Sequence, residues 1–246
     1  IMQHATNHQR TRIRQEVLAL LTLTLSCALP QSLAAELIAF PESHNKLTIL
    51  CDGQPFVNLE FVAWGKDWSW MGFRGDSSAS NNVTTMTNSA KNAEAEVKLT
   101  ARVQRVGDRQ LTMHTSLIAD QTTELTYIVI SLTPASTGFR DGELGTICAS
   151  GQRNTIKLPL GKQPIGDDIS KFQFRGPGGH FDVTMQPPRD VAADGAVRII
   201  LAAGTLPANV NVEQRLTLDL PEPVEFYADA DDIPEDVDVD RWFEFQ

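Results

Sequence analysis

The chain has 246 residues, of which 41% are hydrophobic and 21% are charged, proportions that are ordinary for a globular protein. Its formal net charge is -10, and most of that charge lies in residues 222–246, where ten acidic side chains stand against one arginine. Residues 36–221 are nearly neutral, so the central region lacks the basic surface that binding to nucleic acid requires.

The first 35 residues have the pattern of an export signal. Three arginines between residues 10 and 14 precede the apolar run 17–25, which is too short to span a bilayer as a permanent anchor. Small residues at 32–35 suit cleavage by a signal peptidase. We therefore expect a signal helix in residues 1–35 and a secreted or periplasmic protein that has no membrane span once the signal is removed.

Three cysteines are present, and the first of them lies within the predicted signal peptide. Cys27 leaves open an anchored lipoprotein, although the residues before it match a lipidation signal poorly. If Cys27 is removed with the signal, Cys51 and Cys148 remain, an even pair that an exported protein can join as a disulfide. Two buried free thiols are the alternative, because a domain of this size does not need a covalent cross-link.

Residues 36–228 alternate β-branched or aromatic residues with polar ones, and Gly, Asp-Gly and Pro separate the runs. No apolar repeat of helical period persists for three turns. We therefore predict an all-β domain, a two-sheet antiparallel β-sandwich of about eleven strands. The predicted strands are Leu47–Cys51, Phe56–Ala63, Trp68–Arg74, Val97–Val106, Leu111–Ile118, Leu125–Leu132, Thr155–Leu158, Phe172–Arg175, His180–Met185, Val197–Ala202 and Val212–Leu220.

Two segments do not fit the strand pattern. Asp76–Ala93 is rich in Ser, Asn and Thr and is predicted to be a long exposed loop. Residues 229–246 are predicted to be an acidic linker and, from the aromatic residues near their end, the start of a following domain. The acidic residues Asp236, Asp238 and Asp240 alternate as calcium ligands can, but the Gly and Glu of an EF-hand are not in place. No cofactor is therefore predicted.

Three of the four tryptophans lie within seven residues, and this cluster is the candidate binding site. Exposed indoles form a flat surface on which sugar rings or a partner protein can pack, with the neighbouring charged side chains free to bind hydroxyl groups. Burial in the core is the alternative, because tryptophans are mostly buried. The candidate ligand-binding residues are Trp64, Asp67, Trp68, Trp70 and Arg74.

No catalytic or metal-binding motif is legible in the sequence. Gly-x-Ser-x-Gly, Cys-x-x-Cys and His-x-His are all absent. The tripeptide Arg74-Gly75-Asp76 matches an adhesion motif, but a motif this short arises often by chance. A pair of carboxylates for glycoside hydrolysis leaves no readable spacing in a sequence, so a self-contained hydrolase stays an alternative.

Several aromatic stretches resemble the N-terminal β-sandwich module of large exported glycoside hydrolases, the β-agarase and β-galactosidase-like proteins of environmental bacteria. The resemblance covers roughly residues 45–246 and lies in the stretches 64–72, 125–132, 196–201 and 240–245. It implies a non-catalytic module that contacts polysaccharide or an adjoining catalytic domain. The catalytic acids of that family lie downstream of this chain, so none is assigned here. A surface adhesion or scaffold domain is the third hypothesis.

Overall fold

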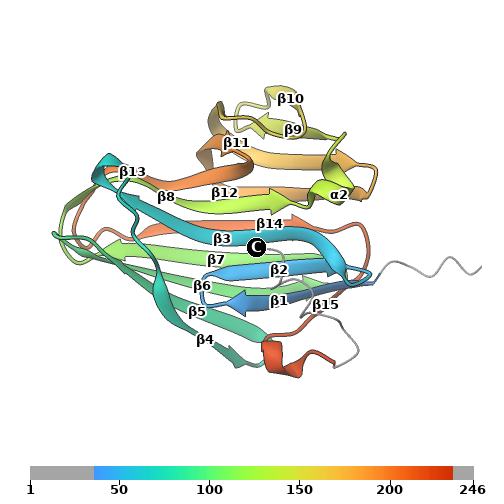
Figure 1. Ribbon diagram of the computed structural model, residues 1–246, viewed down its shortest axis with the longest axis horizontal. Coiled ribbons are helices and arrows are strands. Elements are labelled where there is room, and N and C mark those ends of the chain that lie inside the picture. The colour runs from blue at the N-terminus through green and yellow to red at the C-terminus, as the bar shows by residue number, and fades with distance from the viewer. Residues whose placement is uncertain (1–35, 235–246) are drawn as a thin grey trace, which may run out of the picture. The chain divides into compact units, whose positions relative to one another are not determined.

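The computed structural model describes residues 36–234, and strands dominate this part of the chain (Figure 1). The prediction of an all-β protein is confirmed, with fifteen strands in the described residues instead of about eleven. Short helical turns are formed by Lys66–Trp68 (η2), Ser136–Phe139 (α2) and Ala230–Asp232 (η3). The strands are β1 (Leu37–Ser43), β2 (Lys46–Cys51), β3 (Gln54–Gly65), β4 (Arg74–Ser80), β5 (Val83–Lys91), β6 (Glu96–Gly107), β7 (Gln110–Ala119), β8 (Thr123–Pro134), β9 (Glu143–Cys148), β10 (Arg153–Lys157), β11 (Gln163–Gly176), β12 (Gly179–Asp194), β13 (Ala196–Leu206), β14 (Val212–Asp219) and β15 (Val224–Phe226).

All fifteen strands are hydrogen-bonded into one continuous sheet. Its main path runs β15-β1-β2-β3-β8-β13-β12-β14-β7-β6-β5-β4, and β11, β9 and β10 branch from β12. Neighbouring strands are antiparallel, except that β1 and β15 are parallel. The expected division into two separate sheets is therefore not observed.

The long strand β12 explains why the sheet does not divide. Its first part, Asp182–Gln186, pairs with β14, whereas Val191–Asp194 pairs with β13. Pro187 and Pro188 lie between these parts and have no N–H group to donate to a ladder. The sequence prediction ended this strand near Met185, but the chain continues in extended form and joins both halves of the sheet.

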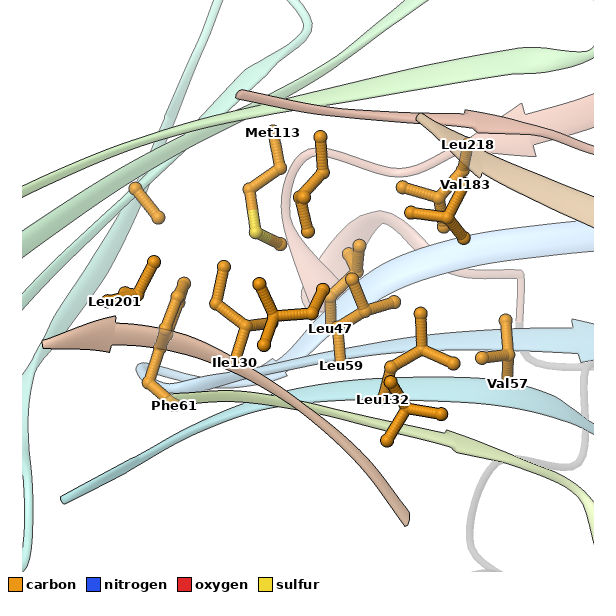
Figure 2. Close-up of a cluster of buried hydrophobic side chains, with 14 of the residues drawn as sticks. Leu47, Val57, Leu59, Phe61, Met113, Ile130, Leu132, Val183, Leu201 and Leu218 are labelled. Carbon is orange, nitrogen blue, oxygen red and sulfur yellow. The ribbon is translucent and has the colours of Figure 1, made fainter. Parts of the chain in front are cut away.

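The hydrophobic core lies between the two halves of the curled sheet. Figure 2 shows Phe61 and Ile130, from β3 and β8, pointing toward Met113 of β7. Leu218 of β14 and Val183 of β12 face Leu132 across the same space. Full burial of each such side chain contributes about 1.5–3 kcal/mol to folding, so the inward faces of these strands hold the fold together.

The exposed loop predicted for Asp76–Ala93 is wrong, because this segment forms most of the hairpin β4–β5. The hairpin turns at Asn81 and Asn82, which have φ angles of 53° and 58°. Two central residues with positive φ are what a tight hairpin requires, and Asn tolerates this conformation. The Asn-Asn pair was therefore a turn signal inside a composition that otherwise resembles a loop.

Polar side chains on the inward face of β5 hide its alternation in the sequence. Thr84 and Asn88 are buried. The Thr84 hydroxyl donates to the carbonyl oxygen of Ala228 (2.6 Å), and the Asn88 amide donates to that of His44 (2.7 Å). Because the Thr84 hydroxyl and the Asn88 amide group both have an acceptor, a Ser/Thr/Asn-rich strand can face the interior.

Candidate functional site

The outward face of β3 and β8, opposite the core, carries the predicted tryptophan cluster at one end. In the sheet register Trp64 lies opposite Tyr127, and Val62 lies opposite Val129. The neighbouring strand β13 continues the second row, because Ile200 pairs with Val129. Successive side chains of a strand point to opposite faces, so these five residues form a layer outside the sheet.

The chain turns back on itself directly after β3, in residues 65–71, which we call the tryptophan loop. The N–H of Gly65 donates to the carbonyl oxygen of Ser69 (2.8 Å) and closes this loop. Trp70 is thereby bridged to Trp64, the residue that precedes the loop. The loop is at the end of β3 in Figure 1.

The tryptophan loop is not the strand that the sequence predicted over Trp68–Arg74. Asp67 and Trp68 have φ angles of 59° and 63°, in the left-handed region that a bulky L-residue rarely adopts. A strand needs extended backbone, so Trp68 and Trp70 do not share one strand face. Conformations of this kind cost on the order of 1–3 kcal/mol per residue and cluster at binding and catalytic sites.

Contacts from β8 hold the tryptophan loop in place. The Thr126 hydroxyl donates to the carbonyl oxygen of Gly65 (2.8 Å) and accepts from the N–H of Trp68 (3.3 Å). Lys66 Nζ lies 2.7 Å from the Glu124 carboxylate. This hydrogen-bonded pair lowers the pKa of Glu124 and raises the pKa of Lys66. Both side chains are exposed, so the ion pair adds little to stability.

Four aromatic rings pack edge to face around the loop. The ring centroids of Trp68 lie 5.8 Å from Trp64 and 5.7 Å from Tyr127, and those of Trp64 and Trp70 lie 6.1 Å apart. Trp68 is nevertheless 52% exposed and Trp70 is 66% exposed. Burial of the tryptophan cluster in the core, the alternative from the sequence, is therefore wrong for these two indoles.

Two cations lie against the indole rings. The guanidinium carbon of Arg198 is 4.8 Å from the centroid of Trp64, and Lys162 Nζ is 5.9 Å from that of Trp68. Arg198 also pairs with the Asp194 carboxylate at 3.0 Å. Cation–π contacts of this kind contribute about 0.5–1 kcal/mol at exposed sites. They hold Lys162 beside the exposed indole of Trp68 and Arg198 beside Trp64.

A cavity of about 330 Å³ opens beside Trp68 on the outward face of the sheet. Its floor is formed by β8, β12 and β13, its rim carries aromatic and charged side chains, and the start of β11 closes one side. The lining residues are Trp68, Tyr127, Val129, Lys162, Gln163, Pro164, Ala192, Ala193, Asp194, Arg198 and Ile200. A few polar groups around a mostly apolar hollow are typical of a site for a small ligand.

The structure brings together some of the five predicted site residues. Trp68 lines the cavity, and Trp64 packs against both Trp68 and Trp70 of the tryptophan loop. Asp67 is exposed in the same loop but does not line the cavity. Arg74 is exposed as the first residue of β4 and is not among the lining residues either.

Sequence reasoning missed Tyr127, Lys162, Asp194 and Arg198, which complete the cavity. Tyr127 lies in the predicted strand Leu125–Leu132, whose nearly continuous apolar run is typical of a strand buried on both faces. A tyrosine within an otherwise aliphatic strand was the one signal that this position reaches the surface, because its hydroxyl group favours contact with water. The two cations and Asp194 come from distant segments. The pairing of β13 with β8 and β12 brings Arg198 and Asp194 next to β8, and the pairing of β11 with β12 brings Lys162 there.

The two cysteines proposed as a disulfide are free thiols in the structure. Cys51 ends β2, Cys148 ends β9, and both are partly buried against the core. Burial raises the pKa of the Cys51 thiol, and the nearby acidic groups Asp52 and Glu222 act in the same direction. The structure therefore agrees with the alternative of unpaired thiols.

Within residues 36–234 no group of three or more His, Cys, Asp or Glu side chains is placed to hold a metal ion. The helices in that range are all too short to cross a membrane. The predicted signal peptide, Cys27 and the three alternating aspartates after residue 235 lie outside the described residues. The segment predicted as a linker begins inside them, and Ile233 packs against a buried cluster of β1 and β2.

No protein-family model and no curated protein matches this sequence. Three solved structures show similarity in fold. A protein from Escherichia coli K12 assigned as an aldose 1-epimerase is 8% identical, with 75% of this chain and 98% of that chain covered and a TM-score of 0.49. A GalM/aldose epimerase homologue from C. elegans is 8% identical, with 77% and 100% covered and a TM-score of 0.47.

The third structure, from the human microbiome, is assigned as a kojibiose phosphorylase. It is 12% identical, covers 70% of this chain and 23% of its own, and has a TM-score of 0.39. All three proteins carry the names of carbohydrate-active enzymes. At these identities and TM-scores, no residue role and no activity is transferred from them to this chain.

Proposed function

We propose that the cavity beside Trp68 binds a sugar ring, and that this chain is a carbohydrate-binding β-domain of an exported polysaccharide-processing protein. The observation that carries the proposal is the left-handed backbone of Trp68, which keeps a large indole 52% exposed at the rim of a hollow. Both the left-handed backbone and the exposure of a large apolar ring are unfavourable for folding. Such features are expected where the exposed side chain binds a ligand.

The chemistry of the cavity suits a carbohydrate. Sugar rings present polarised C–H groups on one side, which pack on the electron-rich faces of aromatic rings such as Trp68 and Tyr127. Their hydroxyl groups need donors and acceptors, and the Arg198–Asp194 pair offers both. A volume of about 330 Å³ lies within the usual range for small-ligand sites, roughly 300–1,000 Å³.

The lining of the cavity favours binding over hydrolysis. Glycosidases place two carboxyl groups on either side of the scissile bond, about 5–9.5 Å apart. Among the described residues that line the cavity, Asp194 is the single carboxylate, and Arg198 holds it in an ion pair. We therefore propose a binding role for this site. Export and membership of a longer glycoside hydrolase belong to the same proposal and rest on the sequence.

Affinity electrophoresis of the full chain in gels containing agarose, galactan or xylan tests the proposal. We expect retardation by at least one polysaccharide and loss of that retardation in Trp68→Ala. Trp70→Ala is the matched control, since it removes an exposed indole two residues away that does not line the cavity. Circular dichroism confirms that each variant is folded. Unretarded wild-type protein, or a folded Trp68→Ala that is retarded normally, would contradict the proposal.

A further inference from the structure

A second cavity, of about 470 Å³, lies on the same outward face as the first. It is bounded by β3 and β8, by the short helix α2 and by the segment that follows β10. The lining residues are Pro55, Asn58, Thr133, Pro134, Ala135, Ser136, Phe139, Arg140, Leu158, Pro159 and Gly195. None of these residues lines the cavity beside Trp68.

The register of β3 and β8 connects the two cavities. Asn58 lies opposite Thr133 in the second cavity, and Trp64 lies opposite Tyr127 beside the first. These two rows are six residues apart along β3, and each residue of a strand advances about 3.3 Å, so they are roughly 20 Å apart. The two rows between them pair Glu60 with Ser131 and Val62 with Val129. One face of the sheet thus runs from one cavity to the other.

The turn between β12 and β13 lies where the two cavities approach each other. Asp194 lines the first cavity, and the next residue, Gly195, lines the second. Gly195 has a φ of 75°, a conformation that glycine adopts without steric cost. A long ligand that contacts Asp194 in the first cavity and continues past Gly195 therefore reaches the second cavity.

One buried polar atom of a residue that lines the second cavity has no partner among the described residues. The buried amide oxygen of Asn58 has no hydrogen-bond partner among the described residues. A buried acceptor of this kind costs about 1–3 kcal/mol when it is left unpaired. Thr133, Ser136 and Arg140 line the same hollow, and Phe139 and the prolines supply apolar surface. This mixture of hydroxyl, amide, guanidinium and ring surfaces resembles the lining of the first cavity.

We propose that a chain of linked sugars runs along the outward face of β3 and β8, with one ring beside Trp68 and another, several units away, in the cavity of Asn58 and Arg140. The inference rests on the proposed function and adds the class of ligand, an extended polysaccharide and not a single sugar. A span of about 20 Å between the rows exceeds the length of one ring. Contacts at two points of one chain reinforce each other, because the second contact is made intramolecularly.

Isothermal titration of the full chain with xylo- and agaro-oligosaccharides of increasing length tests the inference. We expect affinity to rise at least about tenfold once the oligosaccharide spans both cavities. The double variant Asn58→Leu, Arg140→Ala should lose this gain and bind short oligosaccharides as the wild type does. Trp68→Ala should weaken binding at every length. Asn58→Leu removes an unpaired acceptor and Arg140 is exposed, so the double variant is expected to fold.

The possible failures are distinct. If short and long oligosaccharides bind equally well to the wild type, or the double variant keeps the full gain with length, the extended groove is overturned while the sugar site beside Trp68 stands. If no saccharide of any length binds the folded wild type, the proposed function fails and the extended groove fails with it.

Discussion

The two faces of β3 and β8 are built from alternating residues of the same strands, but one face packs in the core and the other carries the proposed binding site. Inward, Leu59, Phe61 and Ile130 are buried and join the core. Outward, Asn58 and Trp64 are partly exposed and mark the two cavities. Because side chains alternate along a strand, a change on one face should alter stability and a change on the other should alter binding.

The largest effect is expected on the inward face. Phe61→Ala should lower the free energy of unfolding by about 3–5 kcal/mol, because it leaves a cavity in a close-packed core. On the outward side Trp70→Ala should cost only about 1 kcal/mol, the loss of one edge-to-face contact with Trp64. Chemical denaturation of both variants measures the difference. Equal losses would show that the two faces do not differ as described.

A smaller effect is expected where the tryptophan loop is held to β8. Thr126→Val removes a hydroxyl that donates to Gly65 and accepts from Trp68, so it should cost about 1–2 kcal/mol of stability. It should also weaken sugar binding, because Trp68 loses the contact that fixes its backbone. Thr126→Ser keeps the hydroxyl and should restore both properties. Unchanged affinity in a folded Thr126→Val would show that this hydroxyl does not position Trp68.

The smallest effect concerns the ion pair beside the loop. The lowered pKa of Glu124 means that its contribution is present above the ordinary pKa of glutamate and is lost as the pH falls through the lowered value. The raised pKa of Lys66 means that its contribution is present below the ordinary pKa of lysine and is lost as the pH rises through the raised value. The pair is therefore intact between these limits.

Melting curves of the wild type and Glu124→Gln across the pH range check this expectation. The difference in Tm should be small, greatest near neutral pH, and should disappear in strong acid and in strong alkali. Added salt should reduce it, because exposed charges are screened. A difference that persists in strong acid would mean that Glu124 contributes through something other than its charge.

The inward face was predictable from the sequence, because apolar residues at every second position identify a half-buried strand. The segments Phe56–Ala63 and Leu111–Ile118 were found in this way, and both lie within observed strands. Strand β5 was missed because its inward residues Thr84 and Asn88 are polar, and their partners are distant in sequence. The continuous sheet was missed because nothing local reveals that β12 pairs on both sides of Pro187.

The outward face was predictable only in part. Three clustered tryptophans identified the region, but the left-handed backbone of Asp67 and Trp68 leaves no signal in a sequence without glycine at these positions. Arg198 and Lys162 are more than ninety residues from the cluster and reach it only through the strand order. A binding site assembled from several strands depends on the sheet register, which sequence alternation alone does not determine.

The most direct test of the outward site is a crystal structure of the full chain with the longest oligosaccharide that binds. We expect one sugar ring packed on the indole of Trp68, with hydroxyl groups hydrogen-bonded to Arg198 and Asp194, and the chain extending toward Asn58. A sugar bound elsewhere on the protein, with no ligand in the cavity beside Trp68, would contradict the proposal that this cavity is the sugar-binding site.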